Sequence, residues 1–303
     1  MTYPRDMVGY GPHRPHPRWP GGARLALNFV FNYEEGSEYS IPDGDGHSET
    51  GLLEGVSQVA AGERDLYAET LYEFGSRVGI WRLLKLFAEF DRPVTIFACA
   101  LALERNPAVA EAITRAGHDI CCHGWRWIKH WLLTEAEERD HIARAIQSLQ
   151  RTTGSRPLGW YCRSGPSVNT RRLLQEEGGF LYDSDSYADE LPYWDHTGPR
   201  PHLIVPYTMD VNDSKFVNPA GYGSGAEFFD HLKRTFDCLY REGAEAPAMM
   251  SVGLHMRLAG RPGRAEAVRD FLHYIAGFPD VWVCRRTEIA HHWIAHHPPE
   301  PTP

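Results

Sequence analysis

The chain has 303 residues, of which 42% are hydrophobic and 23% charged, and its formal net charge is -9 at pH 7 with histidine neutral. This composition suits a single globular domain whose core needs no disulfides. The negative charge argues against nucleic-acid or anionic-membrane partners, which need a basic surface, and no apolar run approaches the roughly 20 residues of a membrane helix. The N-terminus has no apolar signal core, and the cysteines are sparse, so we expect a cytoplasmic protein with reduced thiols.

The proline-rich residues 1–22 cannot form a helix or a central strand, so they are expected to form an extended surface arm. Residues 37–63 read as a long polar loop of the kind that more often carries function than not. Short apolar runs predict strands at 24–32, 94–98, 118–123, 158–162, 180–182, 203–207, 249–255 and 281–285. Helical spacing and caps predict helices at 69–90, 107–117, 135–152, 169–177, 226–242, 264–276 and 287–296.

This alternation of strands and helices predicts an α/β fold with a parallel sheet of about seven strands, closed or nearly closed into a TIM-barrel-like barrel. We expect one barrel domain over residues 23–297, preceded by the arm 1–22 and followed by a tail at 298–303. No linker or internal repeat divides the chain.

Polar side chains follow several of the predicted strands. Glu34 and Glu35 follow the first, and His123, Arg163 and His255 follow later ones. Because the carboxyl ends of parallel strands meet at one edge of a barrel, these groups are expected to converge on one pocket. The sequence therefore favours a hydrolytic enzyme.

Glu34 and Glu35 are neighbours, and neighbours on an extended strand point to opposite faces. Only one should enter the barrel unless the chain turns at Gly36. If both carboxyls share a pocket, one would hold its proton, which suits acid–base catalysis near neutral pH. A solvated pair on a loop is the alternative.

The other strand-end residues also have structural alternatives. His123 and His255 could be hydrogen-bonded structural histidines. Arg163 could orient a substrate carbonyl through its planar fork, or form a surface salt bridge. Asp183 or Asp185 could orient His255 or Arg163, or cap a turn.

Four segments resemble, in order, the motifs of the polysaccharide deacetylase superfamily (the NodB homology domain). Residues 31–36 (FNYEEG) stand where that family has Thr-Phe-Asp-Asp-Gly, and residues 123–127 (HGWRW) where it has His-Ser/Thr-x-x-x-His. Residues 163–166 (RSGP) match its Arg-x-Pro-like motif, and residues 254–255 match its final Leu-His. The resemblance implies a distorted (β/α) barrel.

The departures from these motifs concern the metal. The family binds its metal through an Asp and two His four residues apart. Here Glu34 and Glu35 replace the Asp pair, and Trp127, whose indole offers zinc no lone pair, stands at the second His position. His130 lies three residues too late to replace that ligand. We therefore expect neither a catalytic zinc site nor another cofactor.

These departures are similar to one branch of the superfamily, the metal-independent allantoinases. Segments outside the motifs also resemble that branch, at residues 5–11, 71–77, 169–173, 176–185 and 192–194. The resemblance extends from about residue 5 to residue 296. Allantoin as substrate is an implication of this resemblance.

We accordingly predict a hydrolase that opens a cyclic amide, allantoin to allantoate, by metal-independent acid–base catalysis. Such a reaction needs a base for the water, donors for the oxyanion and an acid for the leaving nitrogen. Glu35 is expected to activate the water, with Glu34 as the other candidate. His255 is expected to protonate the ring nitrogen.

The remaining predicted site residues would bind the substrate. His123 and Arg163 are expected to orient the carbonyl groups and stabilise negative charge, and Trp127 to wall the pocket. Asn169 and Asp183 are expected to support that pocket. The predicted partner is a small cyclic ureide or imide, and the aromatic residues of the arm predict contact with a neighbouring subunit in a homo-oligomer.

Three alternatives stay open at this point. A metal-dependent carbohydrate N-deacetylase would need a second His ligand and a long exposed groove. A hydrolase for another hydantoin or cyclic imide would share the same amide chemistry. A barrel that has lost catalysis and only binds a ligand would also lack the metal ligands.

Overall fold

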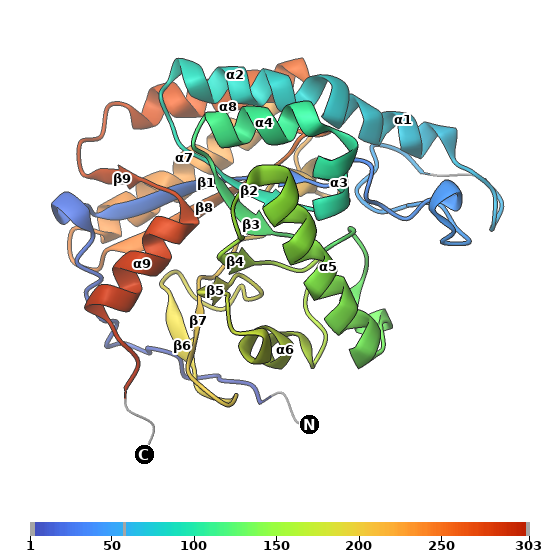
Figure 1. Cartoon of the computed structure of the whole chain (residues 1–303). Coiled ribbons are helices and arrows are strands. Elements are labelled where there is room, and N and C mark those ends of the chain that lie inside the picture. Colours follow the sequence, from blue (N-terminus) through green and yellow to red (C-terminus); the bar gives the residue numbers. More distant parts are fainter. Residues whose placement is uncertain (1–3, 57–58, 301–303) are drawn as a thin grey trace.

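A curled nine-stranded sheet forms the centre of the computed structural model, which describes residues 4–56 and 59–300 (Figure 1). The strand order is β6-β7-β5-β4-β3-β2-β1-β8, and β9 pairs with the start of β1. All pairs are parallel except β6 with β7. The strands are β1 Leu25–Tyr33, β2 Thr95–Ala98, β3 Asp119–Cys122, β4 Gly159–Trp160, β5 Tyr182–Asp183, β6 Tyr193–Asp195, β7 His202–Ile204, β8 Ala248–His255 and β9 Val281–Val283.

Helices cover the outside of this sheet. They are α1 Leu66–Phe74, α2 Ile80–Glu89, α3 Ala100–Arg105, α4 Pro107–Arg115, α5 Glu135–Thr153, α6 Thr170–Glu177, α7 Gly225–Glu242, α8 Pro262–Ile275 and α9 Arg286–His296. Along the outer layer α7 packs on α8, α8 packs on α2, and α5 packs on α3, α4 and α6 (Figure 1). The predicted single-domain α/β fold with a distorted barrel is confirmed.

The local predictions differ from the structure in a few places. One π-helical turn, Gly75–Gly79, divides the helix predicted over 69–90 into α1 and α2. The capping box at Thr134 begins α5 as its sequence indicates. The short helix α3 and the antiparallel strand β6 were not predicted, because neither contains enough residues to show a period.

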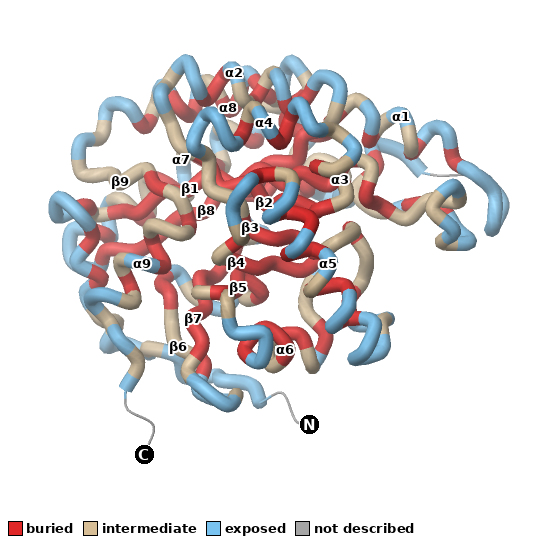
Figure 2. The backbone as a smooth tube through the Cα atoms, in the orientation of Figure 1, coloured by how far each residue is buried: buried red, intermediate tan, exposed pale blue. Residues whose placement is uncertain are grey.

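β1 has two faces that are both buried, as its position between β2 and β8 requires. Its odd-numbered residues from Leu25 to Tyr33 belong to the core that lies under the helices. On the other face, Ala26 and Val30 belong to a second core, which includes Trp19 of the arm. β1, β2 and β8 are buried along their whole length, whereas β9 at the edge is only partly buried (Figure 2).

The second face of the sheet also holds a buried cation. Arg286, at the start of α9, is fully buried and donates to Asn28 of β1, Ser251 of β8 and Ser184 after β5. It also donates to the carbonyl oxygen of Pro206 at 2.8 Å. Its side chain therefore crosses the interior and ties together strands from distant parts of the sheet.

The N-terminal arm packs against the chain's own barrel. Tyr10 donates its hydroxyl to the carbonyl oxygen of Pro192, and the Trp19 indole donates to that of Ala248. The carbonyl oxygen of Pro17 lies 2.8 Å from His292 Nε2. No contact with another subunit is tested by this structure, so the homo-oligomer stays a prediction.

Two further predictions concern the state of the cysteines and the absence of a membrane-spanning helix. All six cysteines are free thiols, and five of them are buried. Within residues 4–56 and 59–300, no helix combines the length and the apolar character that crossing a membrane requires.

Candidate active site

Glu34 lies at the carboxyl edge of β1 and contacts two histidines and one arginine. Its Oε1 lies 3.4 Å from His123 Nε2 and 3.5 Å from His255 Nε2. Its Oε2 accepts a hydrogen bond from Arg257 Nη1 at 2.8 Å. These four residues are between 1% and 5% exposed. The predicted convergence of strand-end residues is therefore found for Glu34, His123 and His255.

The two imidazole rings are fixed by partners behind them. Asp213 accepts from His255 Nδ1 at 2.6 Å and from the His255 backbone N–H at 2.7 Å. His123 Nδ1 donates to the carbonyl oxygen of Tyr161 at 2.8 Å, and the His123 ring stacks on the Tyr161 ring. Both histidines therefore turn Nε2 towards Glu34.

Burial and charge set the protonation of this cluster. Burial disfavours the charge on Glu34, but Arg257 and then His255 outweigh it and hold the pKa of Glu34 well below its usual value. Burial likewise disfavours the charge on His255, but Glu34 and Asp213 together raise the pKa of His255 to about 9. Near neutral pH, the site holds a carboxylate beside an imidazolium.

Glu35 points away from the two histidines. Its Oε2 accepts from the Glu34 backbone N–H at 3.0 Å and its Oε1 from that of Arg257 at 3.2 Å. A Cβ placed on Gly75 would lie 2.3 Å from Glu35 Oε1, so this carboxyl is pressed against the helical layer. Burial, reinforced by Glu34 and opposed by Arg257, raises the pKa of Glu35 to about 7. The two acids lie just after β1, where the chain turns, and Arg257 Nη1 lies 2.8 Å from Glu34 Oε2 and 3.5 Å from Glu35 Oε1.

Arg257 completes the cluster and was not predicted. It lies in the turn that follows β8, two residues after His255, and its guanidinium reaches Glu34 Oε2. Its guanidinium carbon lies 4.2 Å from the Tyr72 ring centroid and 5.2 Å from that of Trp127. Its Nε lies 3.4 Å from the carbonyl oxygen of Leu52, and its buried Nη2 has no hydrogen-bond partner. No strand period could have found it, because it lies beyond the end of β8.

The segment 49–53 contacts two arginines at this edge, Arg257 through Leu52 and Arg163 through Glu49. Arg163 forms a bidentate pair with Glu49 at 2.6 and 2.8 Å, and it donates to the carbonyl oxygen of Trp127. Its guanidinium lies 3.6 Å from the Trp127 ring centroid. Arg163 was expected to orient substrate carbonyls, but both terminal nitrogens of its guanidinium bind Glu49. In this structure Arg163 therefore holds segment 49–53 in place. Trp127 lies between the two arginines, where it can wall a pocket.

Two predicted substrate-binding residues lie elsewhere. Asn169 precedes α6, where its side chain accepts from Arg172. Asp183 pairs with Arg171 at 2.8 Å and lies 3.3 Å from His202. Neither contacts Glu34 or its histidines, because local ion pairs and the start of α6 take up their polar atoms. The acid that orients His255 is Asp213, and the sequence around it gives no periodic signal.

The residues at this edge do not fit the metal that the superfamily motifs imply. Arg257 already places a positive charge on Glu34 Oε2, and Trp127 supplies no lone pair. Over the part of the chain that the structure describes, no group of three or more His, Cys, Asp or Glu side chains is arranged to hold a metal ion. We therefore derive no chemical step through a metal.

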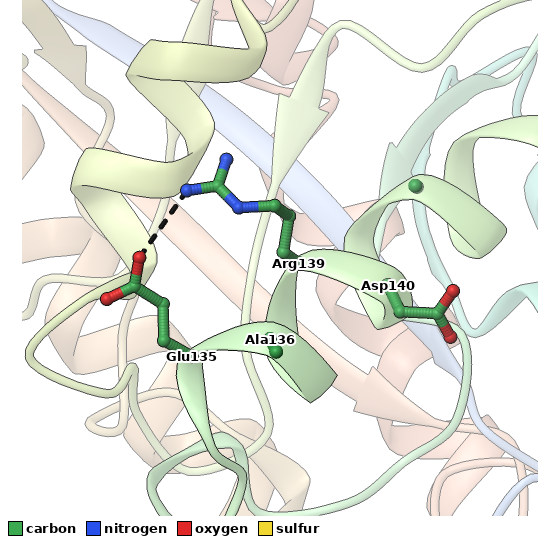
Figure 3. Close-up of a pocket in the computed structure, with 5 residues that line it drawn as sticks. Glu135, Ala136, Arg139 and Asp140 are labelled. Carbon is green, nitrogen blue, oxygen red and sulfur yellow. Dashed lines mark hydrogen bonds and ion pairs between the residues drawn. The ribbon is translucent and has the colours of Figure 1, made fainter.

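Two surface cavities lie outside this cluster. One, of about 550 Å³, follows the exposed side of α5, where Glu135 and Arg139 point towards one another (Figure 3). Its residues form a solvated helix surface. The other, of about 1540 Å³, lies between the arm and the barrel and includes Tyr10, Tyr187 and Tyr207. Neither is lined by Glu34, His123 or His255.

Comparison with known proteins identifies the family. A family model described as polysaccharide deacetylase matches residues 69–181. A Schizosaccharomyces pombe protein whose name assigns it to the polysaccharide deacetylases is 38% identical, over 98% of this chain and 99% of the relative.

Solved structures resemble the whole chain. The "probable polysaccharide deacetylase" of Pseudomonas aeruginosa PAO1 is 52% identical with a TM-score of 0.95, covering 98% of this chain and 100% of that one. PuuE allantoinase is 53% identical with a TM-score of 0.95, covering 99% and 100%. The predicted family is thus confirmed by sequence and by structure, and the chain belongs to the polysaccharide deacetylase family of hydrolases.

Proposed function

We propose that this protein hydrolyses a cyclic amide, allantoin to allantoate, with its own side chains as acid and base. The observation that carries the proposal is the placement of Glu34 against the Nε2 atoms of His123 and His255. The likeness to PuuE allantoinase supports the choice of substrate. Hydrolysis of a carbon–nitrogen bond needs one group that takes a proton from water and one that gives a proton to nitrogen.

Glu34 is the proposed base. It is ionised, and its Oε1 faces both imidazoles, whereas both oxygens of Glu35 accept backbone N–H groups behind it. Position decides before pKa in the choice of a general base. This choice departs from the sequence-based preference for Glu35, whose pKa near 7 would otherwise suit the role.

The proposed reaction proceeds as follows. A water donates one hydrogen bond to Glu34 and the other to His123 Nε2. Glu34 takes a proton as the water oxygen bonds to the carbonyl carbon, and the carbonyl electron pair moves onto oxygen. When that pair returns, the carbon–nitrogen bond breaks and His255 protonates the nitrogen. The proton on Glu34 then passes to His255, 3.5 Å away, which restores both groups. The new carboxylic acid releases the second proton of the water to solvent and leaves as the carboxylate.

The enclosed site favours this function over carbohydrate N-deacetylation. Glu34, His123 and His255 are at most 5% exposed, and Leu52 of segment 49–53 contacts Arg257 beside them. A polymer needs an open groove, whereas a small ring can be enclosed when a loop closes. Other hydantoins and cyclic imides would fit the same chemistry and are the second candidate class.

The test is hydrolysis of a panel containing allantoin, hydantoin, succinimide and an N-acetylglucosamine oligomer, with products identified by mass spectrometry. We expect allantoate to form from allantoin with the highest kcat/KM. Release of acetate from the oligomer alone would overturn the proposal in favour of deacetylation. Absence of any product would support a barrel that only binds ligands.

A further inference from the structure

The guanidinium of Arg257 has one nitrogen, Nη2, that donates to no atom of the protein. Its Nη1 donates to Glu34 Oε2 at 2.8 Å and its Nε lies 3.4 Å from the Leu52 carbonyl oxygen, but its buried Nη2 has no partner. The residue is 2% exposed. Buried polar groups in folded proteins nearly always have partners, so a lone charged donor calls for an explanation. Among the described side chains that contact Glu34, only Arg257 has such an atom.

The position of this donor is fixed. The guanidinium is planar and rigid, so Nη2 lies beside the Nη1 that binds Glu34. Tyr72 and Trp127 face the guanidinium, with centroids 4.2 and 5.2 Å from its central carbon. The backbone N–H of the same residue is held by Glu35. Rings, backbone and carboxylate together prevent Nη2 from swinging to solvent.

We propose that Arg257 is a catalytic residue whose Nη2 donates a hydrogen bond to the substrate oxygen that becomes negatively charged when water attacks. This inference rests on the proposed hydrolysis of a cyclic amide. The oxygen would then lie beside Glu34, whose carboxylate activates the water, and the positive charge of Arg257 would be shared between the two. A fixed donor in a dry site stabilises developing charge without reorganising, and it acts mainly on kcat.

Arg257 could instead serve only to neutralise the two glutamates, and the test must distinguish that role from hydrogen bonding to the substrate oxygen. Arg257 is also the cation that offsets Glu34 and Glu35, and lysine can keep that charge. Lysine, however, presents a single ammonium on a flexible stem and cannot bind Glu34 with one nitrogen while offering a second, fixed nitrogen to the substrate. The variant R257K therefore distinguishes the two roles.

The experiment compares wild type, R257K, R257A and R269A. Arg269 is a partly exposed arginine that pairs with Glu89 on the helical layer, so R269A serves as the control. We expect R257K and R257A to lower kcat for allantoin by about 100-fold or more, with a smaller change in KM. Added guanidinium ion should restore activity to R257A by about tenfold, saturably, and leave wild type and R269A unchanged. A kcat for R257K within about threefold of wild type would overturn the inference while leaving the proposed function intact.

A second measurement does not depend on the variants folding. In a crystal structure of the wild type with allantoate, we expect an oxygen of the product carboxylate within hydrogen-bond distance of Nη2. A carboxylate bound away from Arg257 would overturn the inference. If the wild type does not hydrolyse allantoin or any other ring, the proposed function fails and this inference fails with it.

Discussion

Both carboxylate oxygens of Asp213 accept hydrogen bonds from His255, Oδ1 from the ring Nδ1 and Oδ2 from the backbone N–H. The same Oδ2 also accepts from the backbone N–H of Ala259 at 3.0 Å. The acid therefore fixes the end of β8 as well as the charge on the ring. Its removal should change catalysis in a way that a purely structural contact would not.

The variant D213N should move the alkaline limb of the kcat profile to lower pH. His255 must carry a proton to act as acid, and its pKa of about 9 depends partly on the charge of Asp213. Without that charge the imidazolium loses its proton at lower pH, so activity falls earlier as pH rises. We expect kcat at neutral pH to fall by about tenfold or more. The measurement is kcat against pH, and an unshifted alkaline limb would contradict the assignment.

His255 should also make stability depend on pH. Its pKa in the folded protein, about 9, lies above its ordinary value of 6.5. Its contribution is therefore fully present below the unfolded value and is lost as pH rises through about 9. Denaturant unfolding of wild type and H255Q across this range should show the gap in unfolding free energy closing towards alkaline pH. A gap that widens would show that the ring is not held as an imidazolium.

Glu34 and Glu35 should respond differently to the same substitution. We expect E34Q to lower kcat by about 100- to 10,000-fold, because the amide cannot take a proton from water. E35Q should cost about tenfold or less, since it loses one hydrogen bond to a backbone N–H and a 3.5 Å ion pair with Arg257 but no group that faces the histidines. Both rates are measured on folded variants with matched circular dichroism. A larger loss in E35Q would return the role of base to that residue.

Chelation should leave activity unchanged. Arg257 occupies Glu34 Oε2, and a second cation at that carboxylate would meet like-charge repulsion. The test is kcat after exhaustive dialysis against a strong chelator, with the metal content determined in the same sample. Loss of activity that zinc restores would refute the proposed mechanism.

The close approach of Gly75 to Glu35 predicts opposite signs for two glycine substitutions. A Cβ at position 75 would lie 2.3 Å from Glu35 Oε1, and Glu35 is held by two backbone N–H groups, so G75A should destabilise by about 1–3 kcal/mol. The matched control is G263A in α8, where a Cβ meets nothing within 4 Å and should stabilise by up to about 1 kcal/mol. Thermal unfolding of both variants checks the prediction. Equal effects would show that Glu35 moves freely.

The sequence predicts the parts of the site that regular strands position. The ends of β1, β3 and β8 meet at one edge of the sheet and bring His123 and His255 to Glu34. This relationship follows from parallel pairing and needs no tertiary detail.

The remainder depends on contacts between distant segments. Asp213 reaches His255 because its neighbour Asn212 forms an isolated parallel bridge with Gly253, and no pattern in the sequence marks that pairing. The sequence left two roles open for Arg163, binding a substrate carbonyl or forming a salt bridge. The structure pairs its guanidinium with Glu49, which lies 114 residues earlier in the chain. Local charge alone cannot make that choice.

The position of residues 49–53 has a consequence for speed. Glu49 pairs with Arg163 and Leu53 belongs to the core, so we expect this segment to move aside when a substrate reaches Glu34. The frequency of that opening therefore sets a ceiling on turnover, however fast the bond-breaking step is. If segment 49–53 opened more often, this limit on turnover would rise, but bulk solvent would reach the reacting groups more often as well.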